Sequence, residues 1–379
     1  MLAVLCPGQG AQSAGFLTSW LTSYDVRPRL DELSKAAGFD LHQAGTDPSY
    51  DVVDTAVAQP LLVAAGIVTA ELLGELSPET VVVGHSVGEL TAAAVSGAMR
   101  ADDAVRIAAQ RGAAMKRACA DADGGMTALL GGDATEVQDA IAAAGCVAAN
   151  VNGAGQVVAA GPRAALERLA ASPPTGARLR ALGVAGPFHT EWMAPAATEL
   201  ESAIETVHVV AQHRGIVSNL DGAMVTTGDM MKQRIVSQLT APVRFDLCMQ
   251  TLRGLAVTAV VELAPGGVLA GIAKRELPGV DIVALKNPDD VEAARALARA
   301  QHPAGEQLDA DWRVVVAPAR GTFHPVEHID LTADGRLGVV SNRSGDIEVT
   351  TDATSVLVEW LATDGDPVAA GQPLARVHA

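Results

Sequence analysis

The chain has 379 residues, 49% of them hydrophobic and 3% aromatic, and a formal net charge of −17. This length allows two or three domains, and the acidic, aromatic-poor composition argues against nucleic-acid binding. No uninterrupted apolar stretch reaches the roughly 18 residues of a membrane span, so no membrane partner is expected. The cysteines are scattered, which favours reduced thiols, a cytoplasmic location and no metal site: Cys6, Cys119, Cys146 and Cys248.

Strand-like and helix-like segments alternate through residues 1–120, which predicts a parallel α/β sheet. Within this region the run Thr80 to Val83 leads into Gly84-His85-Ser86-Val87-Gly88-Glu89 and then a helix-like stretch, Leu90 to Met99. Strand, Gly-x-Ser-x-Gly and helix in this order predict a nucleophile elbow that exposes the Ser86 hydroxyl. The Val87 N–H at the helix start could then stabilise an oxyanion, whereas His85 should point away from the serine.

The next helix-like segment runs from Asp102 to Cys119, and Arg111 projects onto its apolar face. A buried arginine is costly unless an anion pairs with it. It could form an internal salt bridge, or it could bind a substrate carboxylate with its two-pronged guanidinium group.

Residues 122–186 are predicted to be an insertion, with strands and helices in the order β-α-β-β-α-β that is typical of a ferredoxin-like subdomain. After it, His189 follows an apolar run and precedes a helix-like stretch, Met193 to Val207, so it is the candidate base for Ser86. A histidine satisfied by backbone groups is the alternative. A further strand is predicted over Val207 to Val217. The site should lie in a crevice between the insertion and the larger subdomain.

Several motifs resemble those of malonyl-CoA:acyl carrier protein transacylases, in the family's order and over about residues 1–290. They include Pro7 to Gln12, the elbow, Gln110-Arg111-Gly112, Asn150-x-Asn152 with Gln156-Val157-Val158, Gly186 to Thr190, Gln238-Leu239, and Glu262 to Leu269. The chain departs from the family at Pro187 and at Arg244-Phe245, neither of which touches a catalytic role.

The resemblance implies an α/β-hydrolase-like core, residues 1–121 and 187–300, around the ferredoxin-like subdomain 122–186. It also implies roles for individual residues. Ser86 would be acylated, His189 would act as base and then acid, and the Gln238 backbone carbonyl would orient the imidazole. The backbone N–H groups of Gln9 and Val87 would form the oxyanion hole. The substrate-binding residues would be Arg111, Phe188, Asn150 and Asn152, with Phe188 and Val87 favouring malonyl over branched groups.

The reaction implied by the resemblance is ping-pong transfer of malonyl from malonyl-CoA, through Ser86, to acyl carrier protein for fatty acid synthesis, with no cofactor. A free-standing acyltransferase of a polyketide pathway fits the same residues. A thioester hydrolase fits less well because it has no use for Arg111, and a non-catalytic scaffold would not need the three side chains together. Acyl carrier proteins are acidic, so this acidic chain would need a local basic patch to bind one.

The tail differs in character. A helix is predicted over Val291 to Ala300, a linker over residues 301–312, and short alternating strands over 313–379. Ala317 to Thr322 and Asp364 to Leu374 resemble the two ends of an all-β biotinyl/lipoyl-type barrel. The chain's last lysine is Lys286, so this domain has no lysine to carry a cofactor. It would be a former carrier domain kept for docking or oligomer contacts, or a small domain that caps the enzyme.

Overall fold

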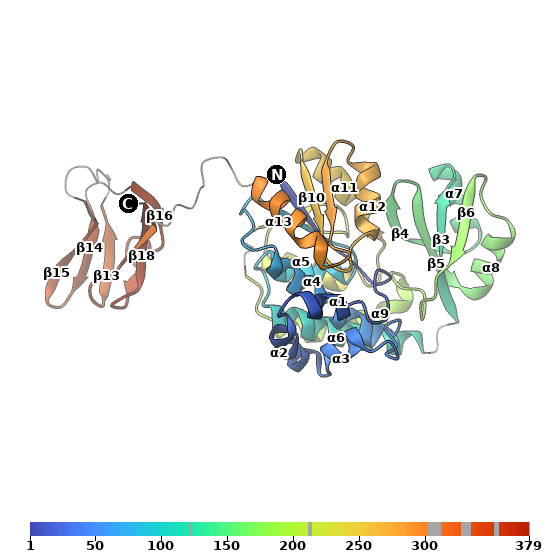
Figure 1. Cartoon of the computed structure of the whole chain (residues 1–379), viewed down its shortest axis with the longest axis horizontal. Coiled ribbons are helices and arrows are strands. Elements are labelled where there is room, and N and C mark those ends of the chain that lie inside the picture. The colour runs from blue at the N-terminus through green and yellow to red at the C-terminus, as the bar shows by residue number, and fades with distance from the viewer. Residues whose placement is uncertain (121–122, 211–213, 302–311, 327–334, 352–355, 379) are drawn as a thin grey trace. The chain divides into compact units, whose positions relative to one another are not determined.

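A computed structural model describes residues 1–120, 123–210, 214–301, 312–326, 335–351 and 356–378. Two compact units divide the chain, Met1–His302 and Pro303–Ala379. Figure 1 shows the first as a mixed α/β unit and the second as strands. Most of the predicted linker, residues 302–311, lies outside the described residues.

The first unit is built on a six-stranded sheet in which every neighbouring pair is parallel except β7–β8. In spatial order the strands are β11 (Asp281–Ala284), β10 (Ala259–Glu262), β1 (Leu2–Cys6), β2 (Val81–Gly84), β7 (Gly215–Val217) and β8 (Met224–Val225). Strands β1, β2 and β10 are buried along their whole length, which explains their continuous apolar sequences. The predicted parallel sheet is therefore confirmed.

Helices cover both faces of this sheet, because alternate residues of β1 belong to two different cores. Val4 packs into the core that contains α4 and α6, and Leu5 packs into the core that contains α11 and α12. The helices of this unit outside the insertion are α1 (Thr18–Ser23), α2 (Arg27–Ala37), α3 (Leu41–Thr46), α4 (Thr55–Leu72), α5 (Gly88–Val95), α6 (Ala101–Cys119), α9 (Ala194–Glu205), α10 (Gly228–Ser237), α11 (Phe245–Gly254), α12 (Val268–Glu276) and α13 (Val291–Ala300).

Helix α4 is long and apolar enough to cross a membrane by length and composition alone. In the structure 72% of it is buried against the rest of the unit, so it is accounted for as the central helix of the core. Its close partner is α6. A side chain at Gly112 of α6 would overlap the backbone carbonyl of Thr55 in α4, so glycine is what allows the two helices to approach.

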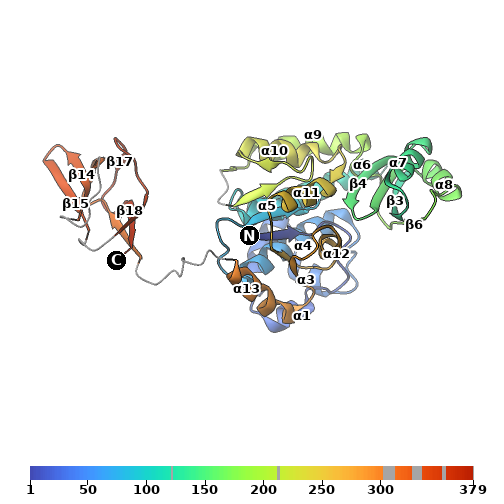
Figure 2. The same cartoon turned by 90° about the horizontal axis from the view of Figure 1, so that it is seen from above.

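The insertion contains β3 (Gly124–Gly131), α7 (Ala134–Ala143), β4 (Val147–Gly153), β5 (Gln156–Pro162), α8 (Arg163–Ala171) and β6 (Ala177–Ala181), in the predicted order. Figure 2 shows it as a lobe at one end of the first unit. Its sheet has the order β6-β3-β5-β4-β9. Strand β9 (Val243–Arg244) comes from the larger part of the unit and pairs in parallel with Asn150 and Val151, which joins the lobe to the sequence just after Gln238.

Two predicted elements are shorter than expected. Helix α5 ends at Val95 rather than Met99, because Gly97 has a left-handed backbone (φ 83°). The strand predicted over Val207 to Val217 is only β7, Gly215–Val217, and His213 lies outside the described residues. Instead of joining the sheet, Val210 donates its backbone N–H to Ala98 in the α5–α6 connection.

The described strands of the second unit form two antiparallel sheets and no closed barrel. One sheet has the order β15-β14-β13-β17 and the other β12-β18-β16, and they share a core that includes Phe323 and Leu374. The hairpin predicted near Asn342 to Gly345 joins β14 to β15. The bounds are β12 (Trp312–Val316), β13 (Gly321–Pro325), β14 (Arg336–Asn342), β15 (Gly345–Thr350), β16 (Val356–Trp360), β17 (Pro367–Val368) and β18 (Pro373–His378).

Candidate active site

Ser86 stands in a sharp turn between β2 and α5. Its backbone has φ 52°, a left-handed conformation that is strained for any residue except glycine. Side chains at Gly84 or Gly88 would overlap the backbone at Glu89 or Cys6 respectively, so both glycines are needed for the turn. The local geometry is that of the predicted elbow.

His189 follows the insertion in the sequence and lies beside Ser86 in the structure. The Ser86 Oγ lies 2.9 Å from His189 Nε2, and His189 Nδ1 lies 2.7 Å from the backbone oxygen of Gln238. Because that carbonyl can only accept, Nδ1 carries the proton and Nε2 is free to accept the serine proton. Gln238 follows α10 directly, and its oxygen occupies the place of an acidic triad member.

Arg111 is on the buried face of α6, as its position on the helix predicted, and is 1% exposed. Its Nη2 donates to Ser86 Oγ (3.2 Å) and to Gln238 Oε1 (3.1 Å), and its Nη1 donates to Gln59 Oε1 (2.7 Å). Its Nε has no hydrogen-bond partner within the described part of the chain. The guanidinium therefore contacts only neutral acceptors and forms no internal salt bridge among the described residues.

Two further residues hold the elbow from behind, and sequence reasoning did not identify their roles. Asn219 accepts the backbone N–H of Ser86 through Oδ1 (3.0 Å), and its own N–H donates to Glu89 Oε1 (2.7 Å). Glu89 is 1% exposed and also accepts from Gln238 Nε2. Gln59, a pocket-lining residue on α4, was missed as well. Only Glu89 had a local signal, as the last residue of the elbow motif.

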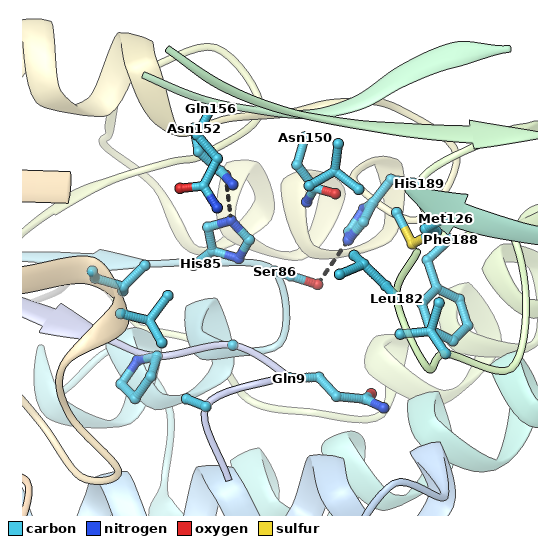
Figure 3. Close-up of a pocket in the computed structure, with 18 of the residues that line it drawn as sticks. Gln9, His85, Ser86, Met126, Asn150, Asn152, Gln156, Leu182, Phe188 and His189 are labelled. Carbon is cyan, nitrogen blue, oxygen red and sulfur yellow. Dashed lines mark hydrogen bonds between the residues drawn. The ribbon is translucent and has the colours of Figure 1, made fainter. Parts of the chain in front are cut away.

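A cavity of about 230 Å³ opens at Ser86 between the larger part of the unit and the insertion. Figure 3 shows the Ser86 oxygen directed toward His189, with Phe188, Met126 and Leu182 beside them. Asn150 and Asn152 also line the cavity, and His85 points away from the serine and donates through Nε2 to Asn152 Oδ1 (2.9 Å). The structure thus brings most of the predicted site residues to one cavity. Arg111, Gln238 and Val87 do not line the cavity; Arg111 hydrogen-bonds to Ser86, Gln238 hydrogen-bonds to His189, and Val87 follows Ser86 in the turn.

The two backbone groups predicted for an oxyanion hole are at the same place. Gln9 lines the cavity, and Val87 begins the turn into α5 next to Ser86. Neither backbone N–H donates a hydrogen bond to another described residue, so both are free to bind an oxygen atom.

Burial controls the charges at this site. Burial, and then the nearby positive charge of Arg111, lower the pKa of His189 to about 3, which keeps the imidazole neutral. Burial lowers the pKa of Arg111 to about 10, and the charge of Glu89 opposes that change. Arg111 therefore stays protonated near neutral pH. No group of three metal-ligating side chains occurs within the described ranges.

Comparisons with known proteins place the chain in a family. A family model described as an acyl transferase domain matches residues 4–306. A malonyl CoA-acyl carrier protein transacylase of Mycobacterium bovis is 48% identical over 297 residues, which are 77% of this chain and 98% of that protein. The chain belongs to the malonyl CoA-acyl carrier protein transacylase family. Its membership makes it an acyltransferase.

Solved members of the transacylase family have the same fold. The crystal structure of the Mycobacterium tuberculosis protein aligns with a TM-score of 0.74 at 48% identity, and covers 78% of this chain and 99% of its own. A malonyl-transacylase solved in complex with a type II polyketide acyl-carrier protein aligns with a TM-score of 0.73 at 27% identity. The alignment covers 78% of this chain and 99% of that protein.

Proposed function

We propose that this chain transfers a malonyl group from malonyl-CoA to the phosphopantetheine thiol of acyl carrier protein for fatty acid synthesis. Family membership and the site geometry both support this activity. The observation that carries the malonyl assignment is Arg111, a buried cation 3.2 Å from the Ser86 hydroxyl that is paired with no carboxylate among the described residues. An acyl group with a free carboxylate would supply the missing partner.

In the first half-reaction His189 Nε2 accepts the Ser86 proton while Oγ attacks the malonyl thioester carbonyl. The carbonyl oxygen becomes negatively charged between the N–H groups of Gln9 and Val87. When the C–S bond breaks, the imidazolium returns the proton to the departing thiolate, and CoA leaves as the free thiol. Malonyl-Ser86 remains.

The second half-reaction runs the same chemistry with a new nucleophile. His189 accepts the thiol proton of phosphopantetheine, the thiolate attacks the malonyl-serine ester, and the proton returns to Ser86 Oγ. The Gln238 carbonyl holds the imidazole in one tautomer throughout. Binding of the malonyl carboxylate by Arg111 leaves less room for a hydrolytic water, which favours transfer over hydrolysis.

Intact mass tests this function. Wild type and Ser86→Ala are each mixed with malonyl-CoA, and acyl carrier protein is then added. A malonyl adduct that forms only in the wild type and moves to the carrier protein is expected. Steady release of CoA without an adduct would instead indicate a hydrolase. A type II polyketide carrier protein run in parallel addresses the second candidate, which the solved complex with such a carrier favours.

We also propose the finer domain assignments. The element order and strand order of residues 122–186 support a ferredoxin-like subdomain within an α/β-hydrolase-like core. For residues 313–379, the two sheets and the hairpin at Asn342 to Gly345 support a biotinyl/lipoyl-like domain. Arg343 lies on that hairpin and no lysine follows Lys286, so the domain would act without a lysine-linked cofactor, in the cytoplasm with the enzyme.

A further inference from the structure

Glu89 is a buried carboxylate that the proposed reaction does not use. It lies in the first turn of α5 and is 1% exposed. Its two oxygens accept from the Asn219 backbone N–H (2.7 Å) and from the Gln238 side-chain Nε2. Burying a carboxylate without a salt bridge is costly, so an acid in this position calls for an explanation beyond packing.

The Gln238 side chain joins this acid to the arginine of the site. Its Oε1 accepts from Arg111 Nη2 (3.1 Å), while its Nε2 donates to Glu89 and more weakly to the Ser86 backbone oxygen (3.3 Å). All three contacts require the same orientation of the amide. The result is a chain of hydrogen bonds from the Asn219 N–H through Glu89 and Gln238 to Arg111.

We propose that Glu89 is a positioning residue that fixes the Gln238 amide and thereby holds Arg111 ready for the acyl carboxylate, so that it contributes to the preference for malonyl over acetyl groups. This inference rests on the proposed function. It assigns Glu89 no contact with substrate, and it requires the effect to pass through Arg111.

The substitution Glu89→Gln tests the hydrogen-bond chain because both of its ends are obligate donors. The Asn219 N–H and the Arg111 guanidinium can only donate, and the carboxylate between them can only accept. A glutamine at position 89 that accepts from Asn219 turns its NH₂ toward Gln238. Gln238 must then either oppose NH₂ with NH₂, or flip and direct its NH₂ at Arg111. Every arrangement leaves one buried donor facing another.

The general base should be less affected than Arg111. Gln238 orients His189 with its backbone oxygen, and its backbone is fixed by its own N–H, which donates to Arg234 at the end of α10. A flip of the side-chain amide leaves this carbonyl in place. The substitution should therefore slow loading of the acyl group that contacts Arg111, which is malonyl.

We expect Glu89→Gln to lower kcat/KM for malonyl loading by about 5- to 150-fold, the effect of one lost or opposed buried hydrogen bond. Acetyl loading, which makes no use of a carboxylate contact, should change by less than about 3-fold. In an Arg111→Ala background the obligate donor at one end is gone and Gln238 can flip freely. There Glu89→Gln should no longer alter the malonyl-to-acetyl ratio.

Glu262→Gln is the matched control. Glu262 is also fully buried at the end of a strand of the same sheet, where it accepts from the backbone N–H groups of Gly267, Leu269 and Ala270. It contacts neither Gln238 nor Arg111, so its loss should lower thermal stability without changing the malonyl-to-acetyl ratio. Gln238→Met, which keeps the backbone carbonyl, should reproduce the selective loss if Glu89→Gln does not fold.

The outcomes separate this inference from the proposed function. If the wild type forms no malonyl adduct, the proposed function is wrong. If the wild type is loaded but Glu89→Gln lowers malonyl and acetyl loading equally, or Glu262→Gln shifts the ratio as much, Glu89 has only a structural role. If Glu89→Gln does not fold, a Gln238→Met variant that keeps the wild-type ratio overturns the inference by itself.

Discussion

Replacing Arg111 with alanine should separate recognition of the malonyl carboxylate from the acyl-transfer chemistry. The Arg111 guanidinium donates hydrogen bonds to Gln59 and Gln238, which fix its orientation. Its Nε has no partner within the described residues. A bound carboxylate would gain about two charge-assisted hydrogen bonds, each worth roughly 1.5–3 kcal/mol in a buried site. Their loss, about 3–6 kcal/mol, corresponds to about a 10²- to 10⁴-fold fall in kcat/KM for malonyl-CoA.

Acetyl-CoA provides the internal control, because an acetyl group has no carboxylate to lose. Its loading onto Ser86 should survive in Arg111→Ala or improve. Arg111→Lys keeps the positive charge but loses the two-pronged guanidinium group, so its rate of malonyl loading should lie between those of the wild type and Arg111→Ala. The assay is the rate of Ser86 acylation by each acyl-CoA, followed by intact mass. Equal losses with malonyl and acetyl would show that Arg111 supports the elbow rather than the substrate, and would refute the carboxylate role.

Three other predictions concern the base, the elbow and the pocket. Because the pKa of His189 is lowered to about 3, the neutral imidazole persists as the pH falls, and acetyl loading should stay flat from about pH 8 to about pH 5. Arg111→Ala removes one cause of the lowered pKa, so the pH at which acetyl loading falls on the acid side should rise. A fall near the ordinary histidine pKa in the wild type would contradict the burial argument. The free energy of unfolding of Ser86→Gly, measured in urea, should be about 1 kcal/mol higher than that of Ser86→Ala, since only glycine adopts a φ of 52° without strain. Equal free energies would mean that the turn is unstrained. Phe188 is 6% exposed and lines the cavity, so Phe188→Ala should raise methylmalonyl loading relative to malonyl by about 10-fold in the same mass assay; an unchanged ratio would place the selectivity elsewhere.

The sequence predicted the features of the site that have a local pattern. The elbow follows from glycines spaced around Ser86 between a strand and a helix. The burial of Arg111 follows from the helical periodicity of α6. The positions of Gln9, Gln238 and the two asparagines came from the family motifs, since no local periodicity points to them.

The hydrogen bonds behind the elbow could not be predicted in this way. Glu89 was visible as the last residue of a motif, but its burial depends on Asn219, 130 residues later, and on Gln238, 149 residues later. Gln59 lies on the apolar helix α4, where a lone amide gives no sign of its partner. These contacts join polar groups that are far apart in the sequence, and they are decided by how the helices and strands pack rather than by the residues on either side.

The second unit lies outside the part of the chain that the family motifs cover. The relative from Mycobacterium bovis matches over 98% of its length within 77% of this chain, and the family match ends at residue 306, close to where the second unit begins. The residues that we propose for catalysis lie between Gln9 and Gln238, so the proposed chemistry assigns no step to residues 303–379. With no lysine on its hairpin, this unit cannot carry an acyl or cofactor group by a lysine linkage. Raising the local concentration of a bound partner is one contribution that needs no such linkage.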